Sequence, residues 1–250
     1  MPVGTVDLTL AEMVDRHRPL YQGSGIDAKL NPLIRAGSSP NLRQQDILNI
    51  LRTSRSVFFD THVEVVSGHH TATYLRFESI AHFPELIQQI AGDMADWIRR
   101  MFQSSPITGL VATCSAAELL AQGVADVLHD TTGLRVALTP YSCETGRIGT
   151  DINVGTIKAG ERFLALNDVT TRGNCVSKLG KVITDHGGVL AGMMVFARRD
   201  SGQFPLMNEL IARHPFYYTT DLDMPQWESA HCPLCRAHKP LLSWKDMPAL

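Results

Sequence analysis

Between residues 163 and 186, an apolar run, a short polar loop and a helix-forming segment follow one another without interruption. The apolar run Phe163–Leu166 predicts a buried strand, and Gly173–His186 carries apolar residues at helical spacing. The loop between them holds Asn167, Asp168, two threonines and a glycine. A strand that passes through such a loop into a helix is typical of α/β folds, in which ligands bind at the carboxyl ends of the strands.

The same alternation of strand and helix covers most of the chain. Strands are expected around a turn at Ser67-Gly68, and a helix is expected from Pro84 to Phe102, because proline suits the first turn of a helix. Further strands are predicted at 107–112, 134–139 and 189–197, and a helix at 116–128. This order predicts an α/β, Rossmann-like fold whose central, mostly parallel sheet is covered by helices on both faces.

Composition shifts along the chain indicate three parts. Residues 1–43 are expected to form an N-terminal extension, or hood, with a short amphipathic segment at Leu8–Leu20 and a stretch rich in Gly, Ser and Pro. Residues 44–200 are expected to form the α/β domain. Residues 201–250 are expected to form a C-terminal segment that is rich in proline and contains Cys-Pro-Leu-Cys.

Charge and cysteine content narrow the class of protein. The chain has 250 residues and a net charge of −2, so no overall basic field points to a nucleic acid or an anionic membrane. It has no apolar run of about 18 residues, and its first residues do not resemble a secretory signal. The five cysteines are odd in number and widely spread, which argues against a disulfide framework and predicts a cytoplasmic protein.

The loop after the predicted strand has the chemistry of a phosphate site. A helix N-terminus presents free backbone N–H groups and a partial positive charge. Thr170 and Thr171 add hydroxyl donors, and Gly173 lets the backbone approach a ligand closely. Asp168 can accept hydrogen bonds from sugar hydroxyls, directly or beside Mg²⁺. The alternative is an ordinary turn between a strand and a helix in which Asp168 is a capping residue.

This segment resembles the signature of type I phosphoribosyltransferases, which bind 5-phosphoribosyl-1-pyrophosphate (PRPP). The resemblance implies that the loop from Thr170 to Cys175 holds the 5-phosphate and that Asn167 and Asp168 face the ribose. It departs from the family at Asn167, where an amide replaces an acidic residue. The PRPP-binding residues implied in this segment are Asn167, Asp168, Val169, Thr170, Thr171, Arg172, Gly173, Asn174 and Cys175.

The resemblance extends to the orotate branch of that family and covers roughly residues 44–200. Ser67-Gly68-His69-His70 matches a turn near the base, and Gly109–Ala117 occupies the place of the pyrophosphate loop. The pyrophosphate contacts implied there are Thr113, Cys114 and Ser115. The acceptor contacts implied by the resemblance are Ser67, His69, Tyr74 and Arg198.

Departures from the orotate branch lie where the chemistry takes place. Val66 stands where relatives carry a basic residue. The loop Tyr141–Arg147, which matches the family's mobile catalytic loop, has no lysine, although the family's lysines there neutralise the departing pyrophosphate. Glu144 and Arg147 are expected to close over the pyrophosphate, with Arg147 as a fork-shaped donor. Orotate is therefore predicted to be a poor acceptor.

The resemblance implies a cytoplasmic, homodimeric transferase that uses Mg²⁺ with PRPP, Asp168 standing beside the ion. Such an enzyme transfers the phosphoribosyl group to a nitrogenous acceptor, either carboxylate-bearing or a modified base, and releases pyrophosphate. Two alternatives stay open: a regulatory protein that senses PRPP or a nucleotide without catalysis, and a specialised transferase of natural-product synthesis. No nucleic-acid or membrane partner is expected.

The tail His231-Cys232-Pro-Leu-Cys235-Arg-Ala-His238 has the composition of half a zinc site. Cys232 and Cys235 are the candidate ligands. No second ligand pair of suitable spacing is evident in the sequence, so a thiol-bearing turn is favoured and Zn²⁺ is the alternative. A nucleophilic role for Cys114 or Cys175 is disfavoured, because no activating motif surrounds them.

Overall fold

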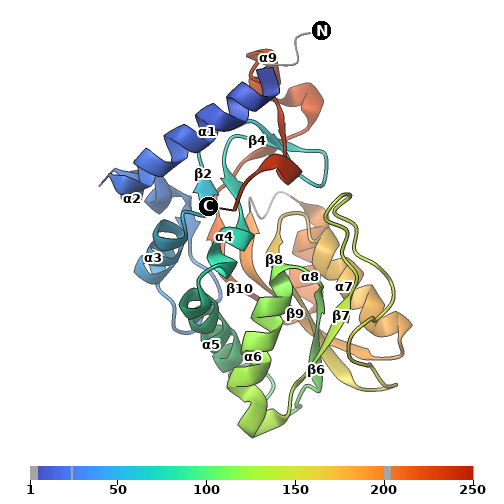
Figure 1. Cartoon of the computed structure of the whole chain (residues 1–250). Coiled ribbons are helices and arrows are strands. Elements are labelled where there is room, and N and C mark those ends of the chain that lie inside the picture. The colour runs from blue at the N-terminus through green and yellow to red at the C-terminus, as the bar shows by residue number, and fades with distance from the viewer. Residues whose placement is uncertain (1–4, 24, 200–203, 250) are drawn as a thin grey trace.

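The computed structural model describes residues 5–23, 25–199 and 204–249 and contains a six-stranded central sheet (Figure 1). The strand order is β1-β10-β9-β8-β6-β7. The five strands from β10 to β7 run parallel to their neighbours, and β1 is antiparallel at the edge, which confirms the predicted α/β class. The strands are β1 (Ile34–Arg35), β6 (Gly109–Thr113), β7 (Arg135–Thr139), β8 (Arg162–Thr170), β9 (Val189–Arg199) and β10 (Phe216–Leu222).

Helices cover both faces of this sheet and form two hydrophobic cores. Side chains alternate between the faces of a strand, so in β8 Leu164 and Leu166 join one core, whereas Phe163 and Ala165 join the other. The first core takes residues from α2 (Ile26–Leu30), α3 (Gln44–Ser54), α4 (Phe77–Ala81), α5 (Pro84–Met101) and α6 (Ala116–Thr132). The second takes residues from α7 (Asn174–Asp185) and α8 (Pro205–Arg213) (Figure 1).

A small second layer consists of short strands at the top of the molecule in Figure 1, and from here on the word hood refers to these strands rather than to residues 1–43. One hood sheet has the order β11-β4-β3-β12, and β2 pairs with β5 in another. The expected turn at Ser67-Gly68 connects β3 to β4, and Gly68 has a φ of +77° that favours glycine. The hood strands are β2 (Val57–Phe58), β3 (Val63–Glu64), β4 (His70–Thr71), β5 (Tyr74–Leu75), β11 (Gln226–Trp227) and β12 (Leu242–Ser243).

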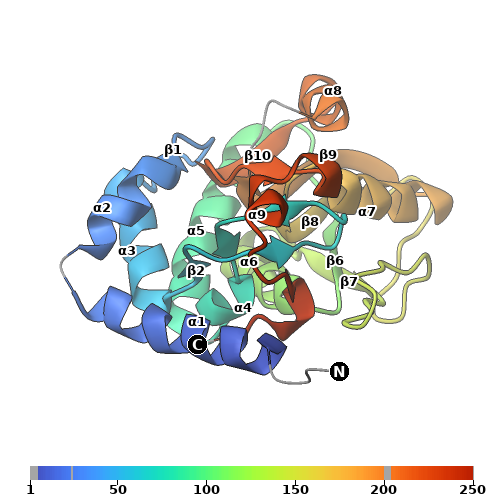
Figure 2. The same ribbon diagram turned by 90° about the horizontal axis from the view of Figure 1, so that it is seen from above.

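Both ends of the chain pack on the hood. The amphipathic segment expected near residues 8–20 lies in α1 (Thr5–Gln22), and His17 of this helix stacks on Phe58 at 4.0 Å between ring centroids. The Nε2 atom of His17 also bonds the Arg55 carbonyl at 2.8 Å. The C-terminal segment supplies β11, α9 (Pro233–Arg236) and β12 (Figure 2). The N-terminal extension and the tail are therefore joined through the hood.

Several element boundaries differ from those expected. β8 continues to Thr170, because its ladder with β9 extends to that residue, so Asn167 and Asp168 lie on the strand. α3 begins at Gln44, and just before it the Asn41 amide donates a hydrogen bond to Asp93 Oδ1 of α5 at 2.9 Å. β1 and β10 join the main sheet from outside the range 44–200, and the boundary expected at residue 200 lies outside the described residues.

Among the described helices, none is both long enough and apolar enough to span a bilayer.

Candidate active site

A cavity of about 260 Å³ lies where the carboxyl ends of β8 and β9 meet the hood. This is the edge of a parallel sheet at which α/β proteins bind ligands. Most of the residues expected to bind PRPP or its acceptor line this cavity: Ser67, Tyr74, Thr113, Ser115, Asn167, Asp168, Val169, Thr170, Thr171, Arg172, Asn174 and Cys175.

The N-terminus of α7 points its first N–H groups into this region without a side-chain cap. Gly173 is the N-cap residue and has a φ of +83°, and as a glycine it provides no side chain to cap the first turn. The positive φ favours glycine at this position, and a Cβ atom there would lie 2.8 Å from Leu210 Cδ1, so that side chain would have to shift. By contrast, Ser115 caps α6 by accepting a bond from the Ala117 amide at 3.3 Å. An uncapped helix start is suited to an anion.

Thr171 is held with its hydroxyl proton directed to a further acceptor. Its Oγ1 atom accepts hydrogen bonds from Arg199 Nε at 3.1 Å and from Gln226 Nε2 at 3.2 Å. A threonine hydroxyl has two acceptor positions and one donor proton. Both acceptor positions are thereby used, which leaves the donor for a ligand oxygen at the start of α7.

The half-buried carboxyl of Asp168 is the most perturbed acid of the cavity. Burial raises the pKa of Asp168 to about 7, and the negative charge of Glu78 acts in the same direction. The Val169 amide donates a bond to Asp168 Oδ1 at 2.7 Å, which opposes the shift. Glu78 forms an ion pair with Arg76 at 3.2 Å. Two carboxyl groups therefore act on one cavity, the condition in which a pKa rises and a cation is favoured.

Three cations line the cavity at positions that the sequence did not indicate: Arg76, Lys178 and Arg199. Lys178 lies one helical turn after Asn174, so the helical period of α7 could have suggested it. Arg76 follows Tyr74 by two residues and so projects from the same side of an extended segment. With Arg172, these groups give the cavity positive charge that does not come from the loop at Tyr141–Arg147.

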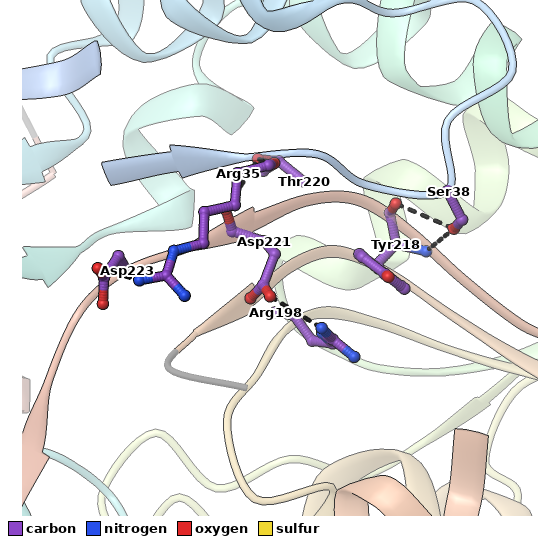
Figure 3. Close-up of polar contacts among 7 residues, drawn as sticks. All are labelled: Arg35, Ser38, Arg198, Tyr218, Thr220, Asp221 and Asp223. Atoms are coloured by element: carbon purple, nitrogen blue, oxygen red, sulfur yellow. Dashed lines mark hydrogen bonds and ion pairs between the residues drawn. The ribbon is translucent and has the colours of Figure 1, made fainter. Parts of the chain in front are cut away.

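Arg198, the expected acceptor contact, does not line the cavity. Its Nη2 atom pairs with Asp221 of β10 at 2.8 Å, and its guanidinium covers the Tyr218 ring at 4.2 Å. Adjacent residues of a strand point to opposite faces, so Arg199 enters the cavity instead. Figure 3 shows the Arg198–Asp221 pair, which joins β9 to β10, near the separate pair of Arg35 and Asp223.

Other predicted residues lie near the cavity but do not line it. His69 packs edge-on to Phe204 at 6.3 Å, and Cys114 Sγ bonds Asn153 Oδ1 at 3.5 Å. Glu144 and Arg147 are exposed to solvent. Cys175 does line the cavity, but burial raises the pKa of its thiol to about 11, so it is protonated near neutral pH.

The loop matched to the catalytic loop is a short hairpin that closes against the hood. Tyr141 pairs with Ile148, and the Ser142 amide bonds the Arg147 carbonyl at 3.0 Å. Gly146 has a φ of +65°, and a Cβ atom there would lie 2.5 Å from Val66. Val66, which stands where relatives carry a basic residue, therefore packs against this hairpin at Gly146.

Comparisons with known proteins agree with this geometry, although no protein-family model matches the chain. The sequence is 28% identical over 197 residues to an orotate phosphoribosyltransferase of Thermus thermophilus, covering 78% of this chain and 98% of the relative. It is 22% identical over 187 residues to the orotate phosphoribosyltransferase of Caldicellulosiruptor bescii, covering 75% and 90%.

Two solved structures share the fold. The orotate phosphoribosyltransferase of Aeropyrum pernix superposes with a TM-score of 0.51 and 15% identity, covering 69% of this chain and 92% of that one. The UMP synthase of Leishmania donovani also gives a TM-score of 0.51 at 15% identity, covering 80% and 37%. The fold is that of the type I phosphoribosyltransferases. Within that class, the chain is orotate phosphoribosyltransferase-like.

Proposed function

We propose that this protein is a PRPP-dependent transferase that moves the 5-phosphoribosyl group to a nitrogenous acceptor and releases pyrophosphate. One observation carries the proposal: an uncapped helix N-terminus and the carboxyl of Asp168 lie in a single cavity at the ends of β8 and β9. The sequence relatives with this activity in their names, and the shared fold, support it.

Catalysis of the proposed reaction depends mainly on positioning the two substrates and stabilising charge in the transition state, rather than on a covalent intermediate with the protein. The start of α7 and Thr171 bind the 5-phosphate. The Asp168 carboxylate accepts hydrogen bonds from the ribose hydroxyls, and the Asn167 amide can donate or accept them. Displacement at ribose C1 develops positive charge on the sugar, which ionised Asp168 stabilises across the cavity. The donor set also fits Mg²⁺, because Asp168 and Glu78 supply oxygen ligands whose repulsion a cation relieves. Bound Mg²⁺ would offset charge on the pyrophosphate.

The acceptor is proposed to bind between the hood and Arg199. The Arg199 guanidinium lies 5.9 Å from the centre of the Tyr74 ring, and both groups line the cavity. Burial raises the pKa of Tyr74, so its phenol is a neutral donor. A planar base that stacks on Tyr74 and carries a carboxylate could pair with Arg199, which takes the role first expected for Arg198.

The homodimer is also retained as a prediction, to be measured by light scattering.

A screen for pyrophosphate release tests the function. The intact protein is incubated with PRPP, Mg²⁺ and one candidate acceptor at a time, and release is compared with that of an Asp168→Asn variant. Acceptor-dependent release by the natural protein supports the transferase. PRPP binding with no release for any purine, pyrimidine or pyridine acceptor would instead support the sensor, and the identity of an active acceptor would decide for or against a specialised pathway.

Orotate is expected to be a poor acceptor, with kcat/KM below about 10⁴ M⁻¹s⁻¹, the lower end of the usual range. The hairpin Tyr141–Arg147 has no lysine, and Val66 removes a further cation from the pyrophosphate side. Steady-state kinetics with PRPP and orotate measure this directly. A higher value would show that Arg76, Lys178 and Arg199 replace the missing lysines, and orotate would then become the proposed acceptor.

Arg147→Ala is expected to lower kcat about tenfold or more while leaving PRPP affinity nearly unchanged. Charge builds on the pyrophosphate as the bond to C1 breaks, so a hairpin cation acts mainly in the transition state. Arg213→Ala is the matched control, because Arg213 is an exposed arginine of α8 outside the cavity lining. Hydrogen exchange should show greater protection of residues 141–149 with PRPP. Equal protection together with unchanged turnover would exclude a catalytic lid.

A further inference from the structure

Four buried or partly buried metal-binding side chains converge in the hood, away from the cavity described above. They are His62, His70, Cys232 and Cys235, and their ligand atoms all lie within 4.8 Å of one another. His62 and His70 come from the β3–β4 hairpin, whereas the cysteines flank the start of α9 in the C-terminal segment. We propose that this group is a structural Zn²⁺ site that fastens the C-terminal segment to the hood.

The distances between the side chains are those of a tetrahedral site. Zn–N bonds of about 2.0–2.1 Å and Zn–S bonds of about 2.3 Å place a nitrogen and a sulfur about 3.6 Å apart and two nitrogens about 3.3 Å apart. His62 Nε2 lies 3.5 Å from Cys232 Sγ and 3.6 Å from Cys235 Sγ. His70 Nδ1 lies 3.2 Å from Cys235 Sγ and 3.1 Å from His62 Nε2. Four of the six separations therefore match a tetrahedral site, and the two others, both from Cys232 Sγ, lie within 4.8 Å.

Hydrogen bonding among the four groups does not account for this convergence. His62 Nδ1 lies 2.9 Å from the Lys239 carbonyl, which can only accept, so Nδ1 carries the proton and Nε2 of the neutral ring presents its lone pair. Three atoms approach that single lone pair. A cation satisfies all of them together, and a backbone carbonyl that fixes the tautomer is the usual outer partner of a metal-binding histidine.

The strand pairing explains how distant residues meet. Glu64 lies opposite His70 in the hairpin, and His62 is two residues before Glu64, so both histidines project from one face. Trp227 of β11 pairs with His70, and Leu242 of β12 pairs with Val63. In the sequence, the Cys232–Cys235 turn lies between β11 and β12. Because both strands pair with the hairpin, the turn is placed over the face that holds the two histidines. His231 and His238, the histidines nearest the cysteines in sequence, are exposed.

The small hydrophobic core of the hood favours stabilisation by a metal ion. Its own hydrophobic core is small, consisting of Phe58, Val63, Val65, Tyr74, Leu242 and Met247. Small units with little apolar core are commonly stabilised by metals. The hairpin that ends in the two histidines also carries the turn at Ser67, and the tail carries Trp244, and both of these residues line the cavity. The ion would thus fix one wall of the cavity without contacting a ligand there.

Metal analysis of the full-length protein tests the proposal independently of any transferase activity. Protein produced with zinc in the medium should contain one Zn²⁺ per chain by mass spectrometry of the metal. Cys235→Ser and His70→Gln should lose it, whereas His231→Gln and His238→Asn, which change the neighbouring exposed histidines, should retain it. Thiol titration should find Cys232 and Cys235 reduced and protected until a strong chelator removes the ion.

A second measurement uses the natural protein, so its result does not depend on whether the variants fold. The natural protein is stripped of metal by a chelator and titrated with Co²⁺, which should give the visible absorption of a tetrahedral site with thiolate ligands. Re-addition of Zn²⁺ should displace Co²⁺ and raise the melting temperature of the stripped protein, because an ion that binds only the folded state stabilises it. Absence of bound zinc in the natural protein, or a disulfide between Cys232 and Cys235, would overturn the proposal.

Discussion

Thr171→Glu should lower the affinity for PRPP by at least about 100-fold, equivalent to about 2.7 kcal/mol of binding free energy. The new carboxylate would lie beside the uncapped start of α7 and within reach of Arg199, which now donates to the Thr171 hydroxyl. It would occupy the position of the 5-phosphate and repel it. Calorimetric titration with PRPP measures the loss.

The controls separate this effect from unfolding. Thr171→Ser keeps the hydroxyl and should bind PRPP with nearly the natural affinity. Thr184→Glu places the same substitution at an exposed position near the C-terminal end of α7, where the threonine hydroxyl bonds the Lys181 carbonyl, and should leave the affinity unchanged. If Thr171→Glu folds normally and still binds PRPP as tightly as the natural protein, the phosphate does not lie at the start of α7.

The α/β class and the turn from β8 into α7 were predictable because both depend on short-range sequence. Apolar periodicity over one strand or one helix sets the alternation of β8, α7 and β9, and a glycine followed by a helix sets the loop. Gly173 is such a position, since its positive φ favours glycine. The turn at Gly68 was predictable for the same local reason.

Contacts between distant segments were not predictable in this way. Arg198 and Arg199 are the same residue type and are adjacent on β9. Arg199 enters the cavity because its face of the strand meets the hood, and this contact between distant segments is not visible in the sequence. The tail showed two candidate ligands at Cys232 and Cys235, but their partners lie about 170 residues earlier, and no spacing rule relates the two pairs. β10 escaped prediction because Thr219, Thr220 and Asp221, polar residues that usually indicate a loop, interrupt its run before the buried Leu222.

Asp168→Asn should abolish most of the activity and also stabilise the folded protein at about pH 8. Removal of a preorganised charge that faces the developing cation typically lowers kcat by about 10²–10³-fold. The stability effect follows from the pKa of Asp168, which burial and Glu78 raise from 3.8 to about 7. Between these values the folded chain keeps a proton that the unfolded chain releases, so the free energy of unfolding falls as the pH rises.

Thermal melts of both proteins across this pH range measure the second effect. The melting temperature of Asp168→Asn should exceed that of the natural protein at about pH 8, and the difference should shrink as the pH falls toward 4, where the aspartate is protonated in both states. Asp151→Asn, at an exposed acid outside the cavity lining, should show no such pH-dependent difference. Loss of activity with a gain in stability would indicate that Asp168 is kept at a cost to the fold because the ligand requires its charge. A less stable Asp168→Asn protein at about pH 8 would contradict this, because it would mean that the ionised carboxylate is already well paired.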